Sequence, residues 1–331
     1  KMQAWQDFLA TQTLSESPIG DCAMTDLSHL GLIRVSGEDK LGFLQGQLTN
    51  DINKVSPSLS QLSSYCSPKG RMLASFRILQ RDEDLLIMLP LELLEATLKR
   101  LRMFVLRSQV TLEDASNALA RIELSGACAA DLLPLDPPTA DNGSVSQDGY
   151  TIVRTPGDRP RFQVIAGPED MQALWKEAQQ TATPTAQQAW ALLDIRAGIP
   201  TVYQQNIEAF VPQMANLQLL DGVSFTKGCY TGQEVVARMQ YLGKLKRRMY
   251  RVRVDTGQPL EPGMELFSAS SDSGQGAGRV VDAAASPDGG YEALVVTPIS
   301  CAEADDLQLG DAGGPPLQLL DMPYPLEQAN A

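Results

Sequence analysis

The residues best suited to do chemistry stand together in one octapeptide, Lys227-Gly228-Cys229-Tyr230-Thr231-Gly232-Gln233-Glu234. Its two glycines permit a tight turn and a close approach of the backbone to a ligand. A helix that begins near Thr231 would point its free amide groups and the positive end of its dipole toward Cys229. Lys227 is close to the thiol in sequence, and both effects favour the thiolate. The pattern predicts a reactive or ligand-binding cysteine. The alternative is a tight turn that buries the thiol, with Glu234 as a capping residue.

A cysteine hydrolase is disfavoured, because such an enzyme needs a base near its nucleophile. His29 is the only histidine in the chain, and it lies in a polar run just before an apparent strand. We therefore expect His29 at the surface rather than in a catalytic pair with Cys229. A single histidine also argues against zinc hydrolase and non-haem iron sites, which use several imidazoles.

The cysteines are odd in number and widely spaced, at Cys22, Cys66, Cys128, Cys229 and Cys301. No CxxC pair occurs, so we predict no metal site of the chain's own, and at 331 residues we expect no disulfide scaffold. Free thiols indicate a reducing compartment. We find neither a targeting segment nor an apolar run long enough to cross a membrane, and we expect a cytoplasmic protein.

The charge is concentrated at one end of the sequence. The whole chain has 27 basic and 40 acidic residues, a net charge of −13. Residues 255–331 contain 13 of the acidic residues but a single basic one, Arg279, whereas residues 1–254 are nearly neutral. Such a break in composition indicates a domain boundary. Direct nucleic-acid binding is not expected, because it needs an excess of Lys and Arg.

A run of basic side chains follows the octapeptide: Arg238, Lys244, Lys246, Arg247, Arg248, Arg251 and Arg253. An earlier group could add to it: Lys69, Arg71, Arg77 and Arg81. One interpretation is a solvated strand face. The other is an anion site for a carboxylate tail or a phosphate, since guanidinium groups pair well with both.

The hydrophobic spacing predicts alternating strands and helices in the first part of the chain, in the order of a split βαβ, ferredoxin-like unit. The expected strands are 32–35, 72–80, 85–89, 110–112 and 120–124, and helices are expected near 41–48, 91–105 and 126–133. Further on, we expect a linker at 134–149, strands at 150–153 and 162–165, and helices at 168–180, 186–197 and 231–241. Residues 199–222 show little periodicity, and from residue 248 onward short strands and Gly/Pro turns predict an all-β module.

With these elements placed, the octapeptide KGCYTGQE resembles the motif of the YgfZ family of folate-binding proteins, relatives of the glycine-cleavage aminomethyltransferase, or T-protein. Ordered matches extend over about residues 30–250. They are VSGEDKLGFLQGQLTND (35–51), SPKGRM (67–72), the stretch from Trp190 to Pro200, FVPQMANL (210–217) and GVSF (222–225).

The resemblance implies an α+β fold of three subdomains around a central opening, with ferredoxin-like elements and a C-terminal β-barrel. Residues 1–245 would form the folate-binding T-protein-like region, as two α+β subdomains at about 20–125 and 126–245 that can interleave. Residues 246–331 would form the small acidic barrel.

The resemblance also implies tetrahydrofolate or a derivative in the central cleft. The family's two folate-marking positions map onto Leu30 and Trp190. Trp190 matches, whereas bacterial relatives have tryptophan in place of Leu30, so stacking on that side is weaker. Asn216 could contact the polar edge of the pterin, and Arg238 or Lys244 the glutamate tail; these assignments are inferences from chemistry.

The implied role is support of iron–sulfur enzymes, including those that methylthiolate tRNA, with these enzymes as protein clients and with Cys229 and Lys227 central. T-protein-like enzymes have an Asp-Asp pair after the Gly turn, where this chain has Ala74-Ser75. The folate nitrogen then lacks its acid–base partner, which argues against aminomethyltransferase turnover. Two alternatives remain. One is a folate-dependent one-carbon transferase with Cys229 as nucleophile; the other is an interaction module that has lost the ligand, as Leu30 would suggest.

Overall fold

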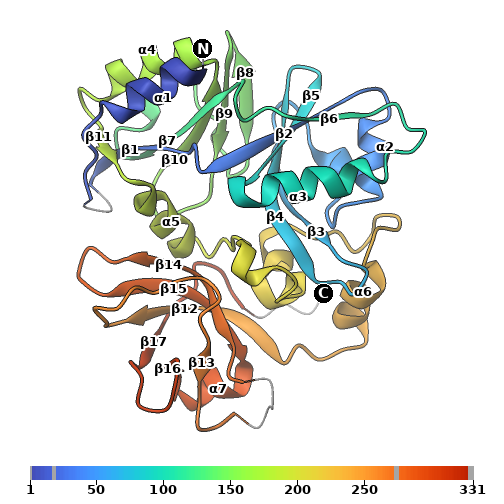
Figure 1. Cartoon of the computed structure of the whole chain (residues 1–331), viewed down its shortest axis with the longest axis vertical. Helices are drawn as coiled ribbons and strands as arrows, with labels where there is room; N and C mark the ends of the chain where they lie inside the picture. The colour runs from blue at the N-terminus through green and yellow to red at the C-terminus, as the bar shows by residue number, and fades with distance from the viewer. Residues whose placement is uncertain (1, 17–19, 272–275, 327–331) are drawn as a thin grey trace. The chain divides into compact units, whose positions relative to one another are not determined.

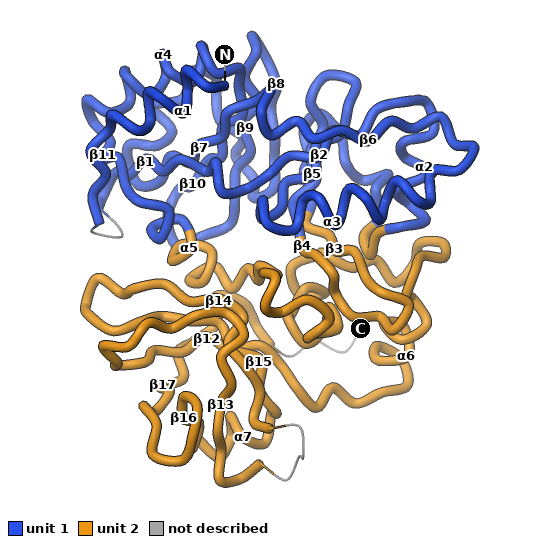
Figure 2. Tube along the Cα trace, in the orientation of Figure 1, with its two compact units in different colours: residues 1–47, 51–61, 76–190 blue, residues 48–50, 62–75, 191–331 orange. Residues whose placement is uncertain are grey.

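The computed structural model describes residues 2–16, 20–271 and 276–326, which belong to two compact units (Figures 1 and 2). Unit 1 contains residues 1–47, 51–61 and 76–190; unit 2 contains residues 48–50, 62–75 and 191–331. The chain therefore passes between the units more than once. The predicted subdomain boundaries near residues 125 and 245 stay predictions.

Unit 1 contains a six-stranded sheet that is antiparallel except for its first pair. In sheet order its strands are β11 (Thr183–Thr185), β1 (Cys22–Asp26), β7 (Ala120–Gly126), β10 (Arg161–Ala166), β9 (Tyr150–Arg154) and β8 (Ser144–Gln147). Helices α1 (Met2–Ala10) and α4 (Pro168–Ala178) lie side by side against it (Figure 1). Trp5 and Trp175, both fully buried, meet edge to face between these helices, with ring centroids 5.7 Å apart.

The same sheet corrects the expectation that every cysteine is a free thiol. Cys22 begins β1 and Cys128 follows the partner strand β7; the two form a disulfide, with 5.6 Å between their Cα atoms. The sequence spacing of 106 residues concealed the pair, because antiparallel pairing of β1 with β7 brings the two positions together. The inference of a reducing compartment from free thiols loses its basis at these two positions.

The second sheet has the strand order β3 (Gln61–Cys66), β4 (Met72–Arg81), β5 (Asp84–Pro90), β2 (Leu30–Ser36) and β6 (Thr111–Asp114). The strands predicted at 72–80 and 85–89 are confirmed as β4 and β5, which pair as a hairpin whose turn contains Asp82 at a positive φ of 53°. Helix α3 (Leu91–Arg102) packs on β2, β5 and β6, and α2 (Lys40–Gln45) follows β2. The strand and helix order confirms the ferredoxin-like elements.

Two predictions in this region are wrong. The expected helix at 126–133 is only a 3₁₀ turn, η2 (Ala130–Leu132), since Gly126 has a φ of 103° that no right-handed helix uses. The expected linker at 134–149 contains β8, which pairs with β9. Another 3₁₀ turn, η1 (Ile52–Lys54), follows α2.

Helix α5 (Gln187–Arg196) confirms the predicted helix at 186–197. The aperiodic stretch that follows is built from 3₁₀ turns: η3 (Gln204–Asn206), η4 (Pro212–Ala215) and η5 (Leu217–Leu220). After it comes α6 (Gln233–Tyr241). The segment is thus ordered by short turns, whose three-residue period the hydrophobic pattern did not reveal.

The acidic end of the chain is mainly β, as predicted. A four-stranded antiparallel sheet has the order β14 (Arg279–Ala285), β15 (Tyr291–Pro298), β12 (Arg247–Val254) and β17 (Leu317–Leu320). A two-stranded sheet pairs β13 (Leu266–Phe267) with β16 (Gln308–Leu309), and α7 (Ile299–Ala304) follows β15. Closure of these strands into a barrel stays a prediction. No helix within residues 2–16, 20–271 and 276–326 combines the length and apolar character needed to cross a membrane.

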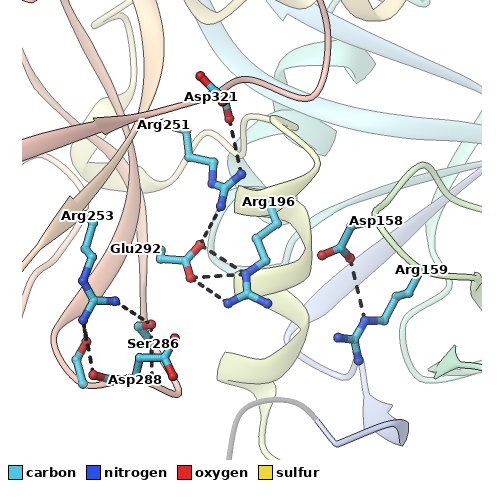
Figure 3. A network of polar contacts seen from close by, with 10 residues as sticks. Asp158, Arg159, Arg196, Arg251, Arg253, Ser286, Asp288, Glu292 and Asp321 are labelled. Atoms are coloured by element: carbon cyan, nitrogen blue, oxygen red, sulfur yellow. Dashed lines mark hydrogen bonds and ion pairs between the residues drawn. The ribbon is translucent and has the colours of Figure 1, made fainter.

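An arginine-rich network ties this sheet to its surroundings within unit 2 (Figure 3). Glu292 of β15 accepts hydrogen bonds from Arg196 of α5 at 2.7 Å and from Arg251 of β12 at 3.3 Å. Arg253 donates to the carbonyl of Gly289 at 2.9 Å and to the Ser286 hydroxyl at 3.1 Å. Arg251 and Arg253, which belong to the predicted basic run, are therefore engaged within the protein.

Candidate functional site

The octapeptide lies in unit 2 and forms the loop that leads into α6. Lys227 anchors this loop. Its ammonium group donates hydrogen bonds to the carbonyl oxygens of Leu48 at 2.6 Å and Asn50 at 2.9 Å, and lies 5.0 Å from the ring centroid of buried Tyr230. The Lys227 side chain thus joins the octapeptide to the end of the FLQGQLTND run, two sequence motifs that lie far apart in the chain. Its observed contacts are those of a positioning residue.

Two glycines lock a second family motif onto the octapeptide. Gly232 has a φ of 84°, and a Cβ there would stand 2.5 Å from the Ser67 carbonyl oxygen and 2.9 Å from the Gly70 Cα. Gly70 has a φ of 70°, and a Cβ there would stand 2.7 Å from the Val235 Cβ. Both positions need glycine for conformation and for space. The Ser67–Met72 turn and the start of α6 are therefore in direct contact.

The helix begins at Gln233 rather than at Thr231, with Gly232 as its N-cap. The Gln233 side-chain amide reaches back to the carbonyl oxygen of Gly228 at 3.2 Å, which fixes the backbone on the N-terminal side of the thiol. The capping role considered for Glu234 is wrong: its carboxylate pairs with Arg238 at 2.7 Å on the exposed face of α6. Arg238 thus has a carboxylate partner within its own helix, and its predicted contact with a folate tail stays a prediction.

Cys229 is exposed, whereas the two other free cysteines, Cys66 and Cys301, are buried. Burial raises the pKa of Cys66 to about 12, so this thiol stays protonated at neutral pH. Tyr230, next to Cys229 in sequence, is turned inward, and burial together with the nearby Cys66 raises the pKa of its phenol. The alternative of a buried thiol at the octapeptide is therefore wrong. The loop presents a single thiol to solvent.

Asn216 occupies a left-handed backbone conformation between η4 and η5, with a φ of 57°. Its amide nitrogen donates to the carbonyl oxygen of Met249 at 2.9 Å and lies 3.4 Å from the Tyr324 hydroxyl. Its amide oxygen is buried and has no hydrogen-bond partner among the residues that the structure describes. The predicted contact with a pterin edge remains open to this oxygen and not to the nitrogen.

Tyr324 had no sequence signal, since it lies outside the family's matched motifs. Its hydroxyl donates to the carbonyl oxygen of Gly198 at 2.6 Å, and its ring stands 2.7 Å from the place of a Cβ at Gly198. Burial raises the pKa of the Tyr324 phenol, so it stays protonated and can donate. Tyr324 thereby joins the Gly-Ile-Pro turn after α5 to Asn216, two further family motifs.

The positions of the missing aspartates are filled by structural side chains. Ala74 and Ser75 of β4 are buried. The Ser75 hydroxyl accepts a hydrogen bond from the Val202 amide at 3.0 Å and lies 3.3 Å from the Pro200 carbonyl oxygen. Ser75 therefore holds the segment after α5 against β4, and no carboxylate replaces the aspartate pair at these two positions.

The two folate-marking positions lie in unit 1. Trp190 of α5 and Leu30 of β2 are each 4% exposed. His29, which precedes Leu30, lies against the Trp190 indole, with ring centroids 4.9 Å apart and a 61° angle between the planes. The expectation of a surface histidine is wrong, because the turn into β2 directs the imidazole inward. Burial, with a smaller contribution from the Arg121 charge, lowers the pKa of His29 to about 3 and keeps the ring neutral at pH 7.

The polar atoms of this aromatic pair are unsatisfied. The indole N–H of Trp190 and both ring nitrogens of His29 are buried and have no hydrogen-bond partner within the described part of the chain. Buried polar atoms are normally hydrogen-bonded, so this cluster favours a polar ligand or ordered water. An indole, a neutral imidazole and an apolar Leu30 side chain suit a flat heteroaromatic ring that carries donors and acceptors, as a pterin does.

The structure therefore brings together Lys227, Gly228, Cys229, Tyr230, Gly232 and Gln233 with the 48–50 and 67–72 turns in unit 2. In unit 1 it brings His29, the residue before Leu30, against Trp190. Within the described residues, no group of three or more His, Cys, Asp or Glu side chains is arranged to hold a metal ion.

Comparison with known proteins identifies the family. Residues 17–154 match the GCVT N-terminal domain. The tRNA-modifying protein YgfZ of Colwellia psychrerythraea is 35% identical over 254 residues, which are 76% of this chain and 77% of that protein. The protein of the same name from Photobacterium profundum is 31% identical over 324 residues, 97% of each chain. The chain belongs to the YgfZ family.

The YgfZ assignment agrees with the fold. The crystal structure of glycine cleavage system aminomethyltransferase T from Bartonella henselae aligns with a TM-score of 0.74 over 94% of this chain and 88% of that one, at 17% identity. This likeness confirms the predicted T-protein-like α+β fold. Several of the motifs that carried the resemblance meet within unit 2. Lys227 contacts residues 48–50, Gly232 contacts the 67–72 turn, and Tyr324 joins Gly198 to Asn216.

Proposed function

We propose that the protein is a tetrahydrofolate-binding accessory protein of tRNA modification, which supports iron–sulfur enzymes such as those that methylthiolate tRNA. The observation that carries the proposal is the construction of the octapeptide loop. Lys227, Gln233 and the Gly70–Gly232 contact hold it so that Cys229 is exposed, while the other free thiols of the chain are buried. The relatives named tRNA-modifying proteins and the GCVT domain support this role.

Folate would be held beside Trp190, with Leu30 and His29 as further walls and the orphaned indole and imidazole nitrogens as its hydrogen-bond partners. When bound, tetrahydrofolate supplies a carrier for one-carbon units. Cys229 would provide a nucleophilic or redox-active thiol, and a cytoplasmic location is part of the proposal. Protein clients, rather than tRNA itself, are the expected partners, because the chain has a net charge of −13.

Titration with tetrahydrofolate tests whether the protein binds this ligand. Calorimetry of the full chain should show saturable binding near the micromolar range, about −8 kcal/mol. The Trp190→Phe variant should lose most of the accompanying change in tryptophan fluorescence. Trp175→Phe is the matched control, because Trp175 lies in the α1–α4 core of unit 1. Absence of binding by the wild-type chain would reject the ligand and favour an interaction module that has lost it.

A complementation assay tests the thiol. In a strain that lacks the chromosomal copy, Cys229→Ala should fail to restore methylthiolated nucleosides in tRNA, measured by mass spectrometry. Cys66→Ala is the matched control, since its thiol is buried and protonated. Full restoration by Cys229→Ala would remove the thiol from the mechanism.

A second candidate is a folate-dependent one-carbon transferase that uses Cys229 as nucleophile. The exposure of the thiol on a glycine-flanked loop favours it. The burial of Ala74 and Ser75 at the positions of the T-protein aspartates disfavours the aminomethyl form of this reaction. Purified protein with candidate amine or thiol acceptors should then give a folate-dependent product; its absence across the acceptors supports the accessory role.

A further inference from the structure

A second polar site in unit 2 is lined by residues outside the octapeptide. It is a cavity of about 420 Å³, with three arginines in its wall: Arg71, Arg247 and Arg279. One carboxylate, Glu265, also lines it, and Phe210 and Met214 supply apolar surface. The charged groups in the described wall are therefore three cations and one anion. None of these residues carries the function proposed above.

The three guanidinium groups come from separate elements that the fold brings together. Arg71 belongs to the turn between β3 and β4, and Gly70 beside it is pressed against α6. Arg247 begins β12 and Arg279 begins β14, and these strands flank β15. In the sheet, Arg247 is opposite Pro298 and Arg279 is opposite Val296, so both stand at the same end of β15.

The arginines are oriented by neutral groups. Arg71 donates to the carbonyl oxygen of Ala209 at 2.8 Å, and Arg247 donates to that of Gly276 at 3.0 Å. Carbonyl oxygens fix the direction of a guanidinium without cancelling its charge. Within the described part of the chain, neither Arg71 nor Arg279 forms an ion pair with a carboxylate. The half-buried cations therefore remain uncompensated at these two positions.

The pKa of Arg247 reflects the mutual repulsion of the three guanidinium groups. Burial lowers the pKa of its guanidinium, and the charges of Arg279 and Arg71 lower it further, against an opposing effect of Cys301. Grouping like charges is unfavourable unless an anion enters. The composition also favours an anion at this cavity. Arg279 is the only basic residue in residues 255–331, which contain 13 acidic residues. The sole cation of the acidic segment lines this cavity.

We propose that this cavity is an oxyanion-binding site that takes a phosphate or carboxylate group of a small ligand between Arg71, Arg247 and Arg279. Planar guanidinium forks match both groups in shape and charge, and the apolar surface of Phe210 and Met214 accommodates the rest of the ligand. The proposal does not rest on folate binding, since every lining residue lies in unit 2 and the probes below contain no pterin.

The test is isothermal calorimetry on the full chain with two probes, inorganic pyrophosphate and γ-linked triglutamate. Saturable binding of either supports the site, and the tighter probe identifies phosphate or carboxylate as the natural group. Arg279→Gln and Arg71→Gln should each weaken binding by about tenfold or more, since each removes a charge-assisted hydrogen bond. Added salt should weaken binding further.

Two other variants keep the test independent of folding defects. Glu265→Gln removes the only carboxylate in the described wall from an exposed position, and it should tighten binding of the same probe. Arg253→Gln is the matched control, because Arg253 is an arginine of the same sheet whose contacts are with the 286–289 turn; it should leave the affinity unchanged. No saturable heat with either probe, or equal affinities in Glu265→Gln, Arg279→Gln and wild type, would overturn the proposal.

Discussion

At the residue scale, exposure separates cysteines that the sequence could only count. Cys229 is exposed, Cys66 and Cys301 are buried, and Cys22 is bonded to Cys128. The flanking glycines and Lys227 singled out Cys229 in the sequence, and its role at a site stays a prediction. The disulfide gave no local signal, because a pair made by strand pairing depends on the register of β1 and β7 rather than on spacing along the chain.

A thiol count with a disulfide-exchanging reagent checks this assignment. The folded, oxidised protein should release one rapid equivalent, from Cys229. Denaturation without reductant should give three equivalents, and denaturation after reduction five. Cys229→Ser should abolish the rapid phase alone. More than one rapid equivalent in the folded wild-type protein, or five before reduction, would contradict the structure.

At the element scale, the contact between the Ser67–Met72 turn and the start of α6 depends on two glycines. Gly232→Ala should lower the free energy of unfolding by about 2 kcal/mol or more. A left-handed alanine alone costs roughly 1–2 kcal/mol, and its Cβ would also meet the Ser67 carbonyl oxygen at 2.5 Å. Urea unfolding measures the change.

The octapeptide supplies its own control for that experiment. A Cβ added at Gly228 would meet no heavy atom within 4 Å, and Gly228 has no positive φ, so Gly228→Ala should be nearly neutral. Equal stability losses in the two variants would mean that the Gly70–Gly232 contact does not hold the loop. The sequence shows a glycine at both Gly228 and Gly232, but only the contact with the Ser67–Met72 turn distinguishes their roles.

A second element-scale prediction concerns Glu292, which joins α5 to β12 and β15 (Figure 3). Burial alone would raise the pKa of this carboxyl, but hydrogen bonds and charge from Arg196 and Arg251 outweigh it and lower the pKa. Glu292→Gln removes the buried carboxylate that both guanidinium groups share, so it should lower the unfolding free energy by about 3 kcal/mol. Because the folded pKa is lowered, the contribution is complete at neutral pH and is lost as the pH falls below the ordinary value.

Glu234→Gln is the matched control for Glu292→Gln. Its carboxylate also pairs with an arginine at 2.7 Å, but both partners are mostly exposed, at 83% and 65% of the side chain. Exposed pairs contribute about 0–1 kcal/mol. Thermal or urea unfolding at pH 7 should therefore show a clearly larger loss of unfolding free energy in Glu292→Gln than in Glu234→Gln. Similar losses in the two variants would show that the Glu292 network is solvated.

At the scale of the whole molecule, patterns with strong periodicity could be predicted and irregular ones could not. The hairpin of β4 and β5 and the β character of the acidic end followed from hydrophobic spacing and turn residues. The end of helix α5 followed from Gly198 and Pro200. The 3₁₀ turns between Gln204 and Leu220 did not, because their order comes from tertiary partners such as Asn216 with Met249. The basic run after the octapeptide had suggested an anion site as one interpretation. The register along β12 distinguishes Arg247, which lines the cavity at the start of the strand, from Arg251 and Arg253, whose contacts lie further along it.

The last prediction uses a property of the whole chain, its single histidine. His29 is half-buried against Trp190, with both ring nitrogens buried, and its pKa is lowered to about 3; a histidine in the unfolded chain titrates near the ordinary value of 6.5. Between these two pH values, the unfolded state therefore binds a proton at His29 and the folded state does not. The contribution of His29 to the free energy of unfolding is therefore complete above pH 6.5. It falls as the pH drops below that value, by about 2 kcal/mol at pH 5.

The difference in unfolding free energy between pH 7 and pH 5 should thus shrink by about 2 kcal/mol in His29→Gln, because other groups titrate equally in both proteins. Proton NMR gives a direct reading. The single imidazole C2–H signal of the folded protein should not shift between pH 8 and pH 5, whereas the urea-unfolded chain should show an ordinary titration. A folded-state titration near pH 6.5 would place His29 in solvent, and it would withdraw both its contact with Trp190 and its part in the proposed folate site.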